Sequence, residues 1–116
     1  MGNLNINTRA AMANTAVSVV ETAGSLDLNT VGDFEAALNH LFRQNQYKII
    51  VDMEKLDYIS SAGIGVIVGN IKEVRKNKGD IKISKVSTQV FKIFQLLDLP
   101  DIIRFHDNER EAAMAF

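Results

Sequence analysis

The chain has 116 residues, of which 47% are hydrophobic and 23% charged, the composition of one globular domain with a core of its own. A net charge of −1 gives no general attraction to nucleic acid or anionic membranes, and the lack of cysteine excludes disulfides, thiolate metal sites and thiol catalysis. No stretch approaches the ~18 apolar residues of a membrane span and no secretory signal is recognisable, so we expect a cytoplasmic protein.

The first part of the chain predicts two paired strands. Leu4 and Ile6 alternate with asparagines, as in a short edge strand, and residues 1–14 are expected to hold this strand and its connection to the next. Residues 1–2 are interpreted as a remnant of cloning. A second strand is predicted over 15–21, in position to pair with the first in antiparallel fashion.

A helix is expected after the second strand. Gly24–Asp27 predicts a turn or bulge that leads into a short extended piece, and Asn29 or Thr30 can cap the helix, with Asp33 completing a capping box with Thr30. The helix should end near Asn45. Its apolar face is formed by residues at helical spacing: Val31, Phe34, Leu38, Leu41 and Phe42.

The central stretch passes from a buried strand into a helix that contains several glycines. Residues 47–52 include a continuous β-branched run, which predicts a strand buried on both faces, and residues 54–58 predict a polar loop. The next helix is expected to start with Ser60 or Ser61 as its cap and to run to about Lys78, with Gly79 as a left-handed C-terminal cap. Its apolar positions follow helical spacing: Ile64, Ile67, Val68, Ile71 and Val74.

The remainder predicts two more strands and two more helices. Residues 81–84 alternate apolar and polar side chains, as in a strand with one solvated face. Ser87 or Thr88 can cap a third helix, residues 102–105 form a short last strand, and Asp107 caps a final helix. Alternating strands and helices imply parallel pairing with right-handed crossovers, and the N-terminal pair makes the sheet mixed.

Few residues suggest enzymatic chemistry. His40 and His106 each lack a neighbouring pattern for metal ligation or for activating a serine, so both are interpreted as surface or terminal-turn histidines. The glycines at 63, 65 and 69 match neither a phosphate loop nor a dinucleotide fingerprint. The histidines and glycines therefore predict no catalytic residue, no cofactor and no metal.

Acidic residues gather near the ends of predicted strands: Asp27, Asp52, Glu54 and Asp57. Strand ends of an open α/β sheet meet at one edge, where ligands and partners usually bind. Two interpretations stay open. Asp27 and Asp57 can satisfy turn amides, or carboxylates beside serines can hold a divalent ion or accept a hydroxyl proton during phosphoryl transfer.

Ser60 and Ser61 stand where the central strand meets the second helix. The simplest interpretation is helix capping, which contributes about 1 kcal/mol, although a helix N-terminus also favours an anion such as phosphate. Capping does not explain the glycines that follow. Missing side chains permit close backbone approach, either to the sheet beneath or to a partner above.

Two linked motifs resemble a known family. Gly24–Asp27 (GSLD) is similar to the G-x-L-D element, and Ile50–Val66 (IVDMEKLDYISSAGIGV) to the signature, of the STAS domain, the sulfate-transporter and anti-sigma-factor-antagonist fold. The similarity extends from the strand at Thr15 to the last helix. It implies a single α/β domain over residues 1–116, with a four- or five-stranded mixed sheet and about four helices packed mainly on one face.

The resemblance also implies a function. Single-domain members that look like this chain are bacterial anti-sigma factor antagonists. Their unmodified form binds an anti-sigma factor with a serine-kinase domain of the histidine-kinase-like ATPase type and frees the sigma factor, and phosphorylation of a loop serine breaks that complex. A serine phosphatase is a further expected partner in this transcriptional switch, and direct binding to nucleic acid or membrane is not expected.

In the family, the phosphorylated serine belongs to a D-S-x-G motif. This places Ser61 as the acceptor, and Ser60, which occupies the position of the acid, is the less favoured candidate. The resemblance implies a partner-binding surface formed by Asp27, Asp57, Tyr58, Ser60, Ser61, Ala62, Gly63, Ile64 and Gly65.

Two other hypotheses compete with this one. A STAS module that acts as a permanent scaffold in a signalling or transport complex, without regulation by phosphorylation, would use Ser61 only as a cap. A small hydrolase with Ser61 as its nucleophile would need a base that neither histidine obviously supplies. The anti-sigma factor antagonist is the favoured function, and the chain is expected not to be an enzyme.

Overall fold

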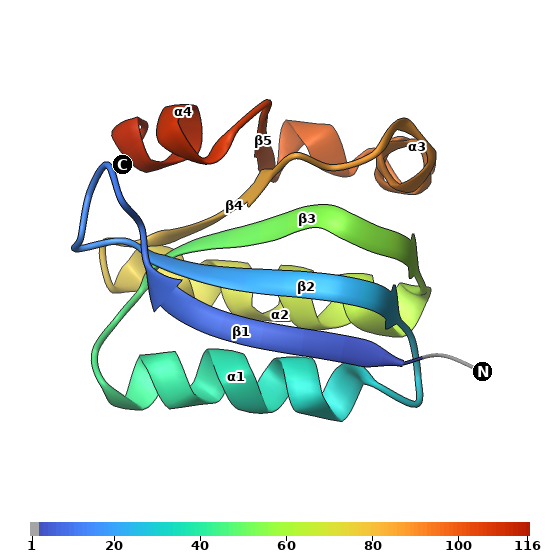
Figure 1. Cartoon of the computed structure of the whole chain (residues 1–116), viewed down its shortest axis with the longest axis horizontal. Coiled ribbons are helices and arrows are strands. Elements are labelled where there is room, and N and C mark those ends of the chain that lie inside the picture. Colours follow the sequence, from blue (N-terminus) through green and yellow to red (C-terminus); the bar gives the residue numbers. More distant parts are fainter. Residues whose placement is uncertain (1–2) are drawn as a thin grey trace.

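The computed structural model describes residues 3–116, which form a five-stranded mixed sheet with four α-helices (Figure 1). Strand order in the sheet follows chain order, and β1 is antiparallel to β2 whereas the other pairs are parallel. The strands are β1 (Leu4–Ala10), β2 (Ser18–Leu26), β3 (Lys48–Ile59), β4 (Asp80–Ser84) and β5 (Arg104–His106). The helices are α1 (Val31–Arg43), α2 (Ser61–Lys76), α3 (Thr88–Leu96), the short 3-10 turn η1 (Leu99–Asp101) and α4 (Glu109–Met114). The interpretation of residues 1–2 as a cloning remnant lies outside the described residues.

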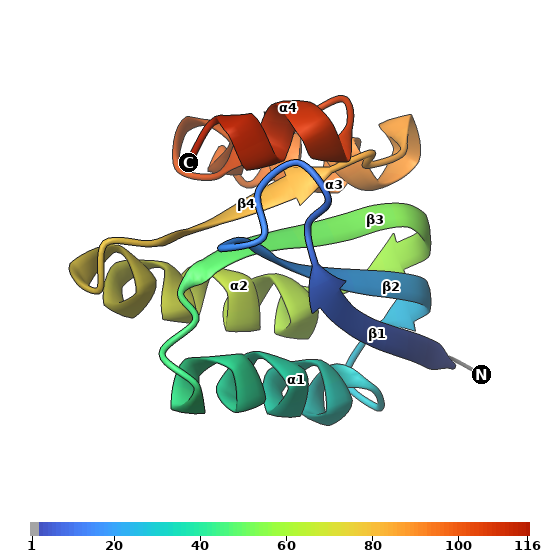
Figure 2. The same cartoon turned by 60° about the vertical axis from the view of Figure 1, so that its left-hand side comes forward.

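The predicted α/β fold class is confirmed, with most of the helical layer on one face of the sheet. Buried side chains of α1, α2 and α3 share one core with the sheet, whereas Ala112 and Ala113 of α4 join Val19 and Ile50 in a smaller cluster. Figure 2 shows α1 and α2 below the sheet and α4 above it. Because side chains alternate along β3, Ile49 enters the large core and Ile50 the small one, so this strand is buried on both faces as predicted.

β3 is longer than predicted, and the prediction of a polar loop over 54–58 is wrong. The strand continues to Ile59 because β2 continues beside it, with register shifts on either side of Gly24 that keep the strands paired. Gly24 has φ 110°, and a Cβ atom there would lie 2.1 Å from the carbonyl oxygen of Asn3. The predicted bulge is therefore part of β2, which begins and ends later than the predicted 15–21.

The C-terminal end of α2 also differs from the prediction. The left-handed residue after the helix is Lys78, with φ 65°, and not Gly79. Gly79 is required for space, because a Cβ atom there would lie 1.9 Å from the carbonyl oxygen of Tyr47. Its N–H donates to the carbonyl oxygen of Val74 at 3.0 Å, which closes the helix. Within residues 3–116 no helix is long and apolar enough to span a membrane.

Two predicted caps are corrected by their hydrogen bonds. Thr30 precedes α1, but its hydroxyl donates to the carbonyl oxygen of Ser25 at 2.8 Å, so it does not cap the helix and forms no capping box with Asp33. Asn108, not Asp107, caps α4 by accepting a backbone hydrogen bond from the first turn at 2.8 Å. In both cases the side chain forms a hydrogen bond with a nearby backbone group that would otherwise have no partner.

The face of β4 that was predicted to be solvated is covered. Lys82 is 7% exposed and Ser84 is fully buried, because α4 packs over this part of the sheet. Lys82 keeps its charge partnered: its Nζ lies 3.7 Å from a carboxylate oxygen of Asp80 and 5.0 Å from the ring centroid of Phe116. Polar alternation within one strand does not reveal that a helix distant in sequence lies over it.

Candidate functional site

The ends of β2 and β3 bring the two sequence motifs together. Both strands end at the same edge of the sheet, at the right of Figure 1, where the β2–α1 loop and the start of α2 meet. The N–H of Ser60 donates to the carbonyl oxygen of Leu26 at 2.9 Å. This hydrogen bond joins the GSLD motif to the SSAG motif.

Ser60 is the N-cap of α2. Its backbone is extended (φ −95°, ψ 172°), and its hydroxyl accepts a hydrogen bond from the N–H of Gly63 at 3.5 Å. Because that hydrogen bond is long, we expect it to contribute about 0.5–1 kcal/mol, the lower part of the range for such caps. Of the two serines, Ser60 is therefore the one that caps the helix.

Ser61 is the first residue of α2, and it is exposed, whereas the neighbouring Ala62 is half-buried. The cap is made by Ser60, which leaves the Ser61 hydroxyl outside it. The first turn of α2 contains no acidic residue. No carboxylate from this turn therefore compensates the positive end of the helix dipole, and an anion attached to Ser61 would lie in a favourable field.

The glycines of α2 have different surroundings. A Cβ atom on Gly63 would lie 2.7 Å from Cγ of Leu26, so this glycine allows the helix to pack closely on the end of β2. A Cβ atom on Gly65 or Gly69 would meet nothing within 4 Å. Of the two explanations offered by the sequence, close packing on the sheet applies to Gly63, whereas Gly65 and Gly69 leave bare helix surface open to solvent.

Large apolar side chains are exposed on the three elements that meet at this edge. Leu28 in the β2–α1 loop is 78% exposed, Tyr58 near the end of β3 is 47% exposed, and Val68 on α2 is 37% exposed. The prediction that Val68 faces the core is wrong. Sequence reasoning missed Leu28 and Val68 as surface residues because an apolar residue at helical spacing, or beside a strand, signals a core position.

The remaining predicted site residues divide between surface and core. Asp27 stabilises the β2–α1 loop, with its Oδ1 accepting from the N–H of Asn29 at 2.9 Å, and Asp57 is exposed near the end of β3. Ile64 is 5% exposed and Gly63 is buried. The prediction that Gly63 and Ile64 lie on a partner-binding surface is therefore wrong, since both face the core.

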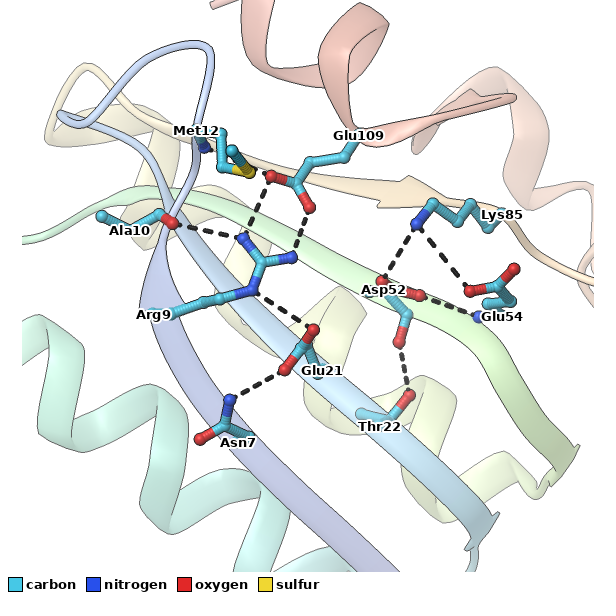
Figure 3. Close-up of polar contacts among 10 residues, drawn as sticks. All are labelled: Asn7, Arg9, Ala10, Met12, Glu21, Thr22, Asp52, Glu54, Lys85 and Glu109. Atoms are coloured by element: carbon cyan, nitrogen blue, oxygen red, sulfur yellow. Dashed lines mark hydrogen bonds and ion pairs between the residues drawn. The ribbon is translucent and has the colours of Figure 1, made fainter.

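Asp52 and Glu54 both contact Lys85, as Figure 3 shows. Lys85 Nζ is 3.7 Å from Asp52 Oδ2 and 3.8 Å from Glu54 Oε1. Asp52 precedes Ser60 by roughly 25 Å of extended strand. Within residues 3–116 no group of three or more His, Asp or Glu side chains is placed to hold a metal ion, so the geometry does not support an ion shared with the serines.

Neither histidine is placed to activate Ser61. His40 is exposed in the last turn of α1, which runs in the same direction as α2, so it lies at the other end of the helical layer from Ser61 (Figure 1). His106 is on β5, and its Nε2 atom is buried. Burial, followed by the charge of Lys82, lowers the pKa of His106.

The chain is a small α/β domain. Where the ends of β2 and β3 meet the start of α2, it presents an exposed serine and exposed apolar side chains. The model of the STAS domain family matches residues 9–112, and the chain therefore belongs to the STAS domain family. An anti-sigma-B factor antagonist of Staphylococcus aureus (strain NCTC 8325 / PS 47) is 31% identical over 90 residues, which cover 78% of this chain and 82% of the relative.

Solved structures show the same fold. The crystal structure of an anti-sigma factor antagonist from Mycobacterium paratuberculosis has a TM-score of 0.86 at 16% identity and covers 97% of this chain and 93% of that one. The Bacillus cell fate determinant SpoIIAA in its phosphorylated form has a TM-score of 0.69 at 21% identity, covering 98% of this chain and all of that one. These likenesses establish the architecture on which the serine junction is placed.

Proposed function

We propose that this chain is an anti-sigma factor antagonist, that its unmodified form binds a serine-kinase anti-sigma factor, and that Ser61 is the phosphorylation site. The observation that carries the proposal is the exposure of Ser61 on the first turn of α2, beside a cap made by a different serine. Relatives named anti-sigma-B factor antagonists support the class of partner. This role places the chain in the bacterial cytoplasm and requires no catalytic activity of its own.

The proposed partner-binding surface combines the predicted residues that are exposed or half-buried with the apolar side chains beside them. It consists of Asp27, Leu28, Asp57, Tyr58, Ser60, Ser61, Ala62, Gly65 and Val68. An apolar centre excludes water, and the bare backbone at Gly65 allows a partner to approach closely. The carboxylates of Asp27 and Asp57 at its border favour a partner with basic residues at the matching positions.

Phosphorylation of Ser61 would act on the complex rather than on the fold. A phosphate adds a charge of about −1.5 to −2, which the N-terminus of α2 stabilises in the free domain. In the complex the same charge would be buried against a partner surface shaped for a neutral hydroxyl. Asp27 and Asp57 belong to the same proposed surface as Ser61, so their carboxylates would add to the negative charge there. A cost of about 1.4 kcal/mol already lowers affinity tenfold, so no larger conformational change is needed. A serine phosphatase would restore binding.

Ser60 has a separate role in this proposal. It occupies the position where the family usually has an acid, and its hydroxyl fixes the first turn of α2. Ser60 therefore sets the orientation of Ser61, while remaining half-buried itself. A kinase would reach the exposed hydroxyl of Ser61 first.

Incubation with the cognate serine-kinase anti-sigma factor and ATP, followed by mass spectrometry of the peptide that contains both serines, tests the proposal. We expect one phosphate on Ser61, no phosphate in Ser61→Ala, and retained phosphorylation in Ser60→Ala. Ser61→Asp should bind the kinase at least about tenfold more weakly. Thr88→Asp is the matched control, since Thr88 is also an exposed first residue of a helix capped by the serine before it, and it should bind as the wild type does.

Two outcomes would contradict the proposal. One is a phosphate that never appears on Ser61, and the other is Ser61→Asp binding as tightly as the wild type. If Ser61→Ala leaves partner binding and its response to ATP unchanged, the chain is instead a permanent STAS scaffold.

A further inference from the structure

We propose that two copies of this chain associate through the free edge of β1 and the exposed side of α1, forming one continuous sheet across a twofold axis. The surface does not include Ser61, and the proposal does not rest on the proposed function. It rests on the backbone pattern of β1, the groove beside it, and the symmetry of the residues that line the groove.

The outer side of β1 presents unpaired backbone groups. The carbonyl oxygen of Asn3 accepts from the N–H of Ser25 at 2.8 Å, so the odd-numbered residues of this strand direct their backbone groups toward β2. Because antiparallel pairs alternate, the even-numbered residues Leu4, Ile6 and Thr8 direct their N–H and C=O groups outward. Within residues 3–116 no strand lies beyond β1 in the sheet.

β1 lacks the usual devices that protect an edge strand. Proteins commonly block such edges with lysine, proline or a bulge, and β1 contains neither residue and pairs with β2 without interruption from Leu4 to Ala10. Its charged residue, Arg9, is held on the opposite face of the sheet by Glu21 and Glu109 (Figure 3). The edge is therefore open to pairing with another strand.

A groove of about 550 Å³ lies beside this edge, between β1 and α1. Its lining includes Leu4, Ile6 and Thr8 from β1 and Asp33, Ala36, Ala37 and His40 from α1. The spacing of the helical residues places them on one side of α1. A strand added to β1 would extend the sheet over this groove and cover the half-buried Leu4 and Ile6.

The helical side of the groove is complementary to itself. Asp33 and His40 are equally distant from the midpoint between Ala36 and Ala37. In an antiparallel pair of α1 helices, Asp33 of each copy faces His40 of the other, and the small alanines meet at the axis. A twofold contact requires such self-complementarity, and this points to a second copy as the occupant of the groove.

The same twofold axis also allows the two β1 strands to pair. Antiparallel pairing centred on Ile6 places Leu4 opposite Thr8 of the second copy and forms about six backbone hydrogen bonds. β1 and α1 both begin at the right of Figure 1, so the middle of the strand lies beside the middle of the helical stripe. Since α1 packs on both β1 and β2, and strands are about 4.8 Å apart, the two α1 axes would be roughly 10 Å apart, a normal helix-packing distance.

Sedimentation analysis from about 1 µM to about 1 mM protein tests the proposal. We expect the wild type to change from monomer to dimer over this range. His40→Asp places like charges opposite each other and should weaken the dimer at least about tenfold, whereas Asn39→Asp, which adds the same charge to α1 away from the groove, should not. Adding Asp33→Lys to His40→Asp should restore the dimer. Asp33 and His40 of one copy are about 10 Å apart along the helix, so this rescue must occur between copies.

A strand variant gives an independent reading. Thr8→Pro removes an N–H that points outward, which leaves the pairing of β1 with β2 intact but should abolish the dimer, with circular dichroism confirming the fold. A wild type that stays monomeric across the range overturns the proposal. So does a His40→Asp variant that dimerises normally, or a double variant that fails to recover. Ser61→Asp should dimerise as the wild type does, which separates this result from the proposed function.

Discussion

Adjacent serines at the start of α2 have different surroundings, although the sequence presents them as equivalent hydroxyls. Ser60 accepts a hydrogen bond from the backbone of the helix, whereas Ser61 is exposed and free of the cap. A cap contributes to stability, and an exposed first-turn hydroxyl is available for modification. This difference at a single pair of residues separates the structural role from the proposed regulatory one.

Alanine substitutions should reveal that difference in stability. We expect Ser60→Ala to lower the free energy of unfolding by about 0.5–1 kcal/mol, because it leaves an N–H of the first turn unsatisfied. Ser61→Ala should change it by less than about 0.5 kcal/mol. Ser87→Ala is a useful reference, since Ser87 caps α3 through a shorter hydrogen bond of 3.1 Å and should cost about 1 kcal/mol. Urea unfolding measures all three, and a larger cost for Ser61→Ala than for Ser60→Ala would contradict the assignment.

At the scale of elements, α4 depends on contacts with the rest of the chain. A helix of six residues is too short to be stable by itself. The guanidinium of Arg9 binds the carboxylate of Glu109 at the start of α4 with two N–H groups and also contacts Glu21 at 3.2 Å. These ion pairs tie the last helix to the first strand, across the sheet face that Figure 3 shows.

This connection predicts an acid-sensitive contribution to stability. The Arg9 hydrogen bond lowers the pKa of Glu109 below its ordinary 4.5, and hydrogen bonds from Asn7 and then Arg9 lower that of Glu21. A carboxylate whose pKa is lower in the folded state stabilises the fold above about pH 4.5, and this contribution is lost as the pH falls through the folded-state pKa. Because Arg9 is one-third exposed, the Glu109 pair should contribute only about 1 kcal/mol.

Urea unfolding at about pH 7 and about pH 3 checks this linkage. Glu109→Gln should lose about 1 kcal/mol at neutral pH and show a smaller further loss in acid than the wild type. Glu35→Gln, which changes an exposed carboxylate on α1, should retain the wild-type pH dependence. Equal acid sensitivity in the Glu109→Gln variant and the wild type would exclude this ion pair as a source of the effect.

At the scale of the whole molecule, the sheet is a layer with an apolar core on each side. The larger core lies between the sheet and helices α1, α2 and α3, and the smaller core lies between the sheet and α4. Ile49 and Ile50, adjacent in β3, are both fully buried but belong to different cores. Both faces of β3 are therefore covered by a core, and α4 is the helix that covers the second face.

Truncation of these two isoleucines tests that architecture. Ile49→Ala and Ile50→Ala should each lower the free energy of unfolding by about 2–4 kcal/mol, because each leaves a cavity in a closed core. Leu96→Ala removes a side chain that is 83% exposed and should change stability by less than about 0.5 kcal/mol. Chemical denaturation gives the three values. A cost below about 1 kcal/mol for Ile50→Ala would mean that α4 does not form a true second core.

Much of the fold follows from short-range patterns in the sequence. The β-branched run at 49–51 predicts a strand buried on both faces, because no solvated side chain interrupts it. The apolar spacing of Phe34, Leu38 and Leu41 predicts the buried side of α1, and all three are buried. The two motifs, GSLD and SSAGIG, predict the STAS family, which the family model matching residues 9–112 confirms, and they mark the junction where the candidate site lies. These features depend on residues close together in the sequence, so they can be recognised without knowledge of the tertiary structure.

Only the tertiary structure decides properties that depend on distant segments. Residues 54–58 form strand because β2 lies beside them, and the polar side of β4 is buried because α4 covers it. Of the two serines, Ser60 takes the cap, since the hydrogen bond from its N–H to Leu26 fixes its backbone at the start of α2. The sequence by itself determined most of the elements, the family and a pair of candidate serines. Packing decided which serine is exposed, because exposure is set by what lies opposite a residue and not by its neighbours in the chain.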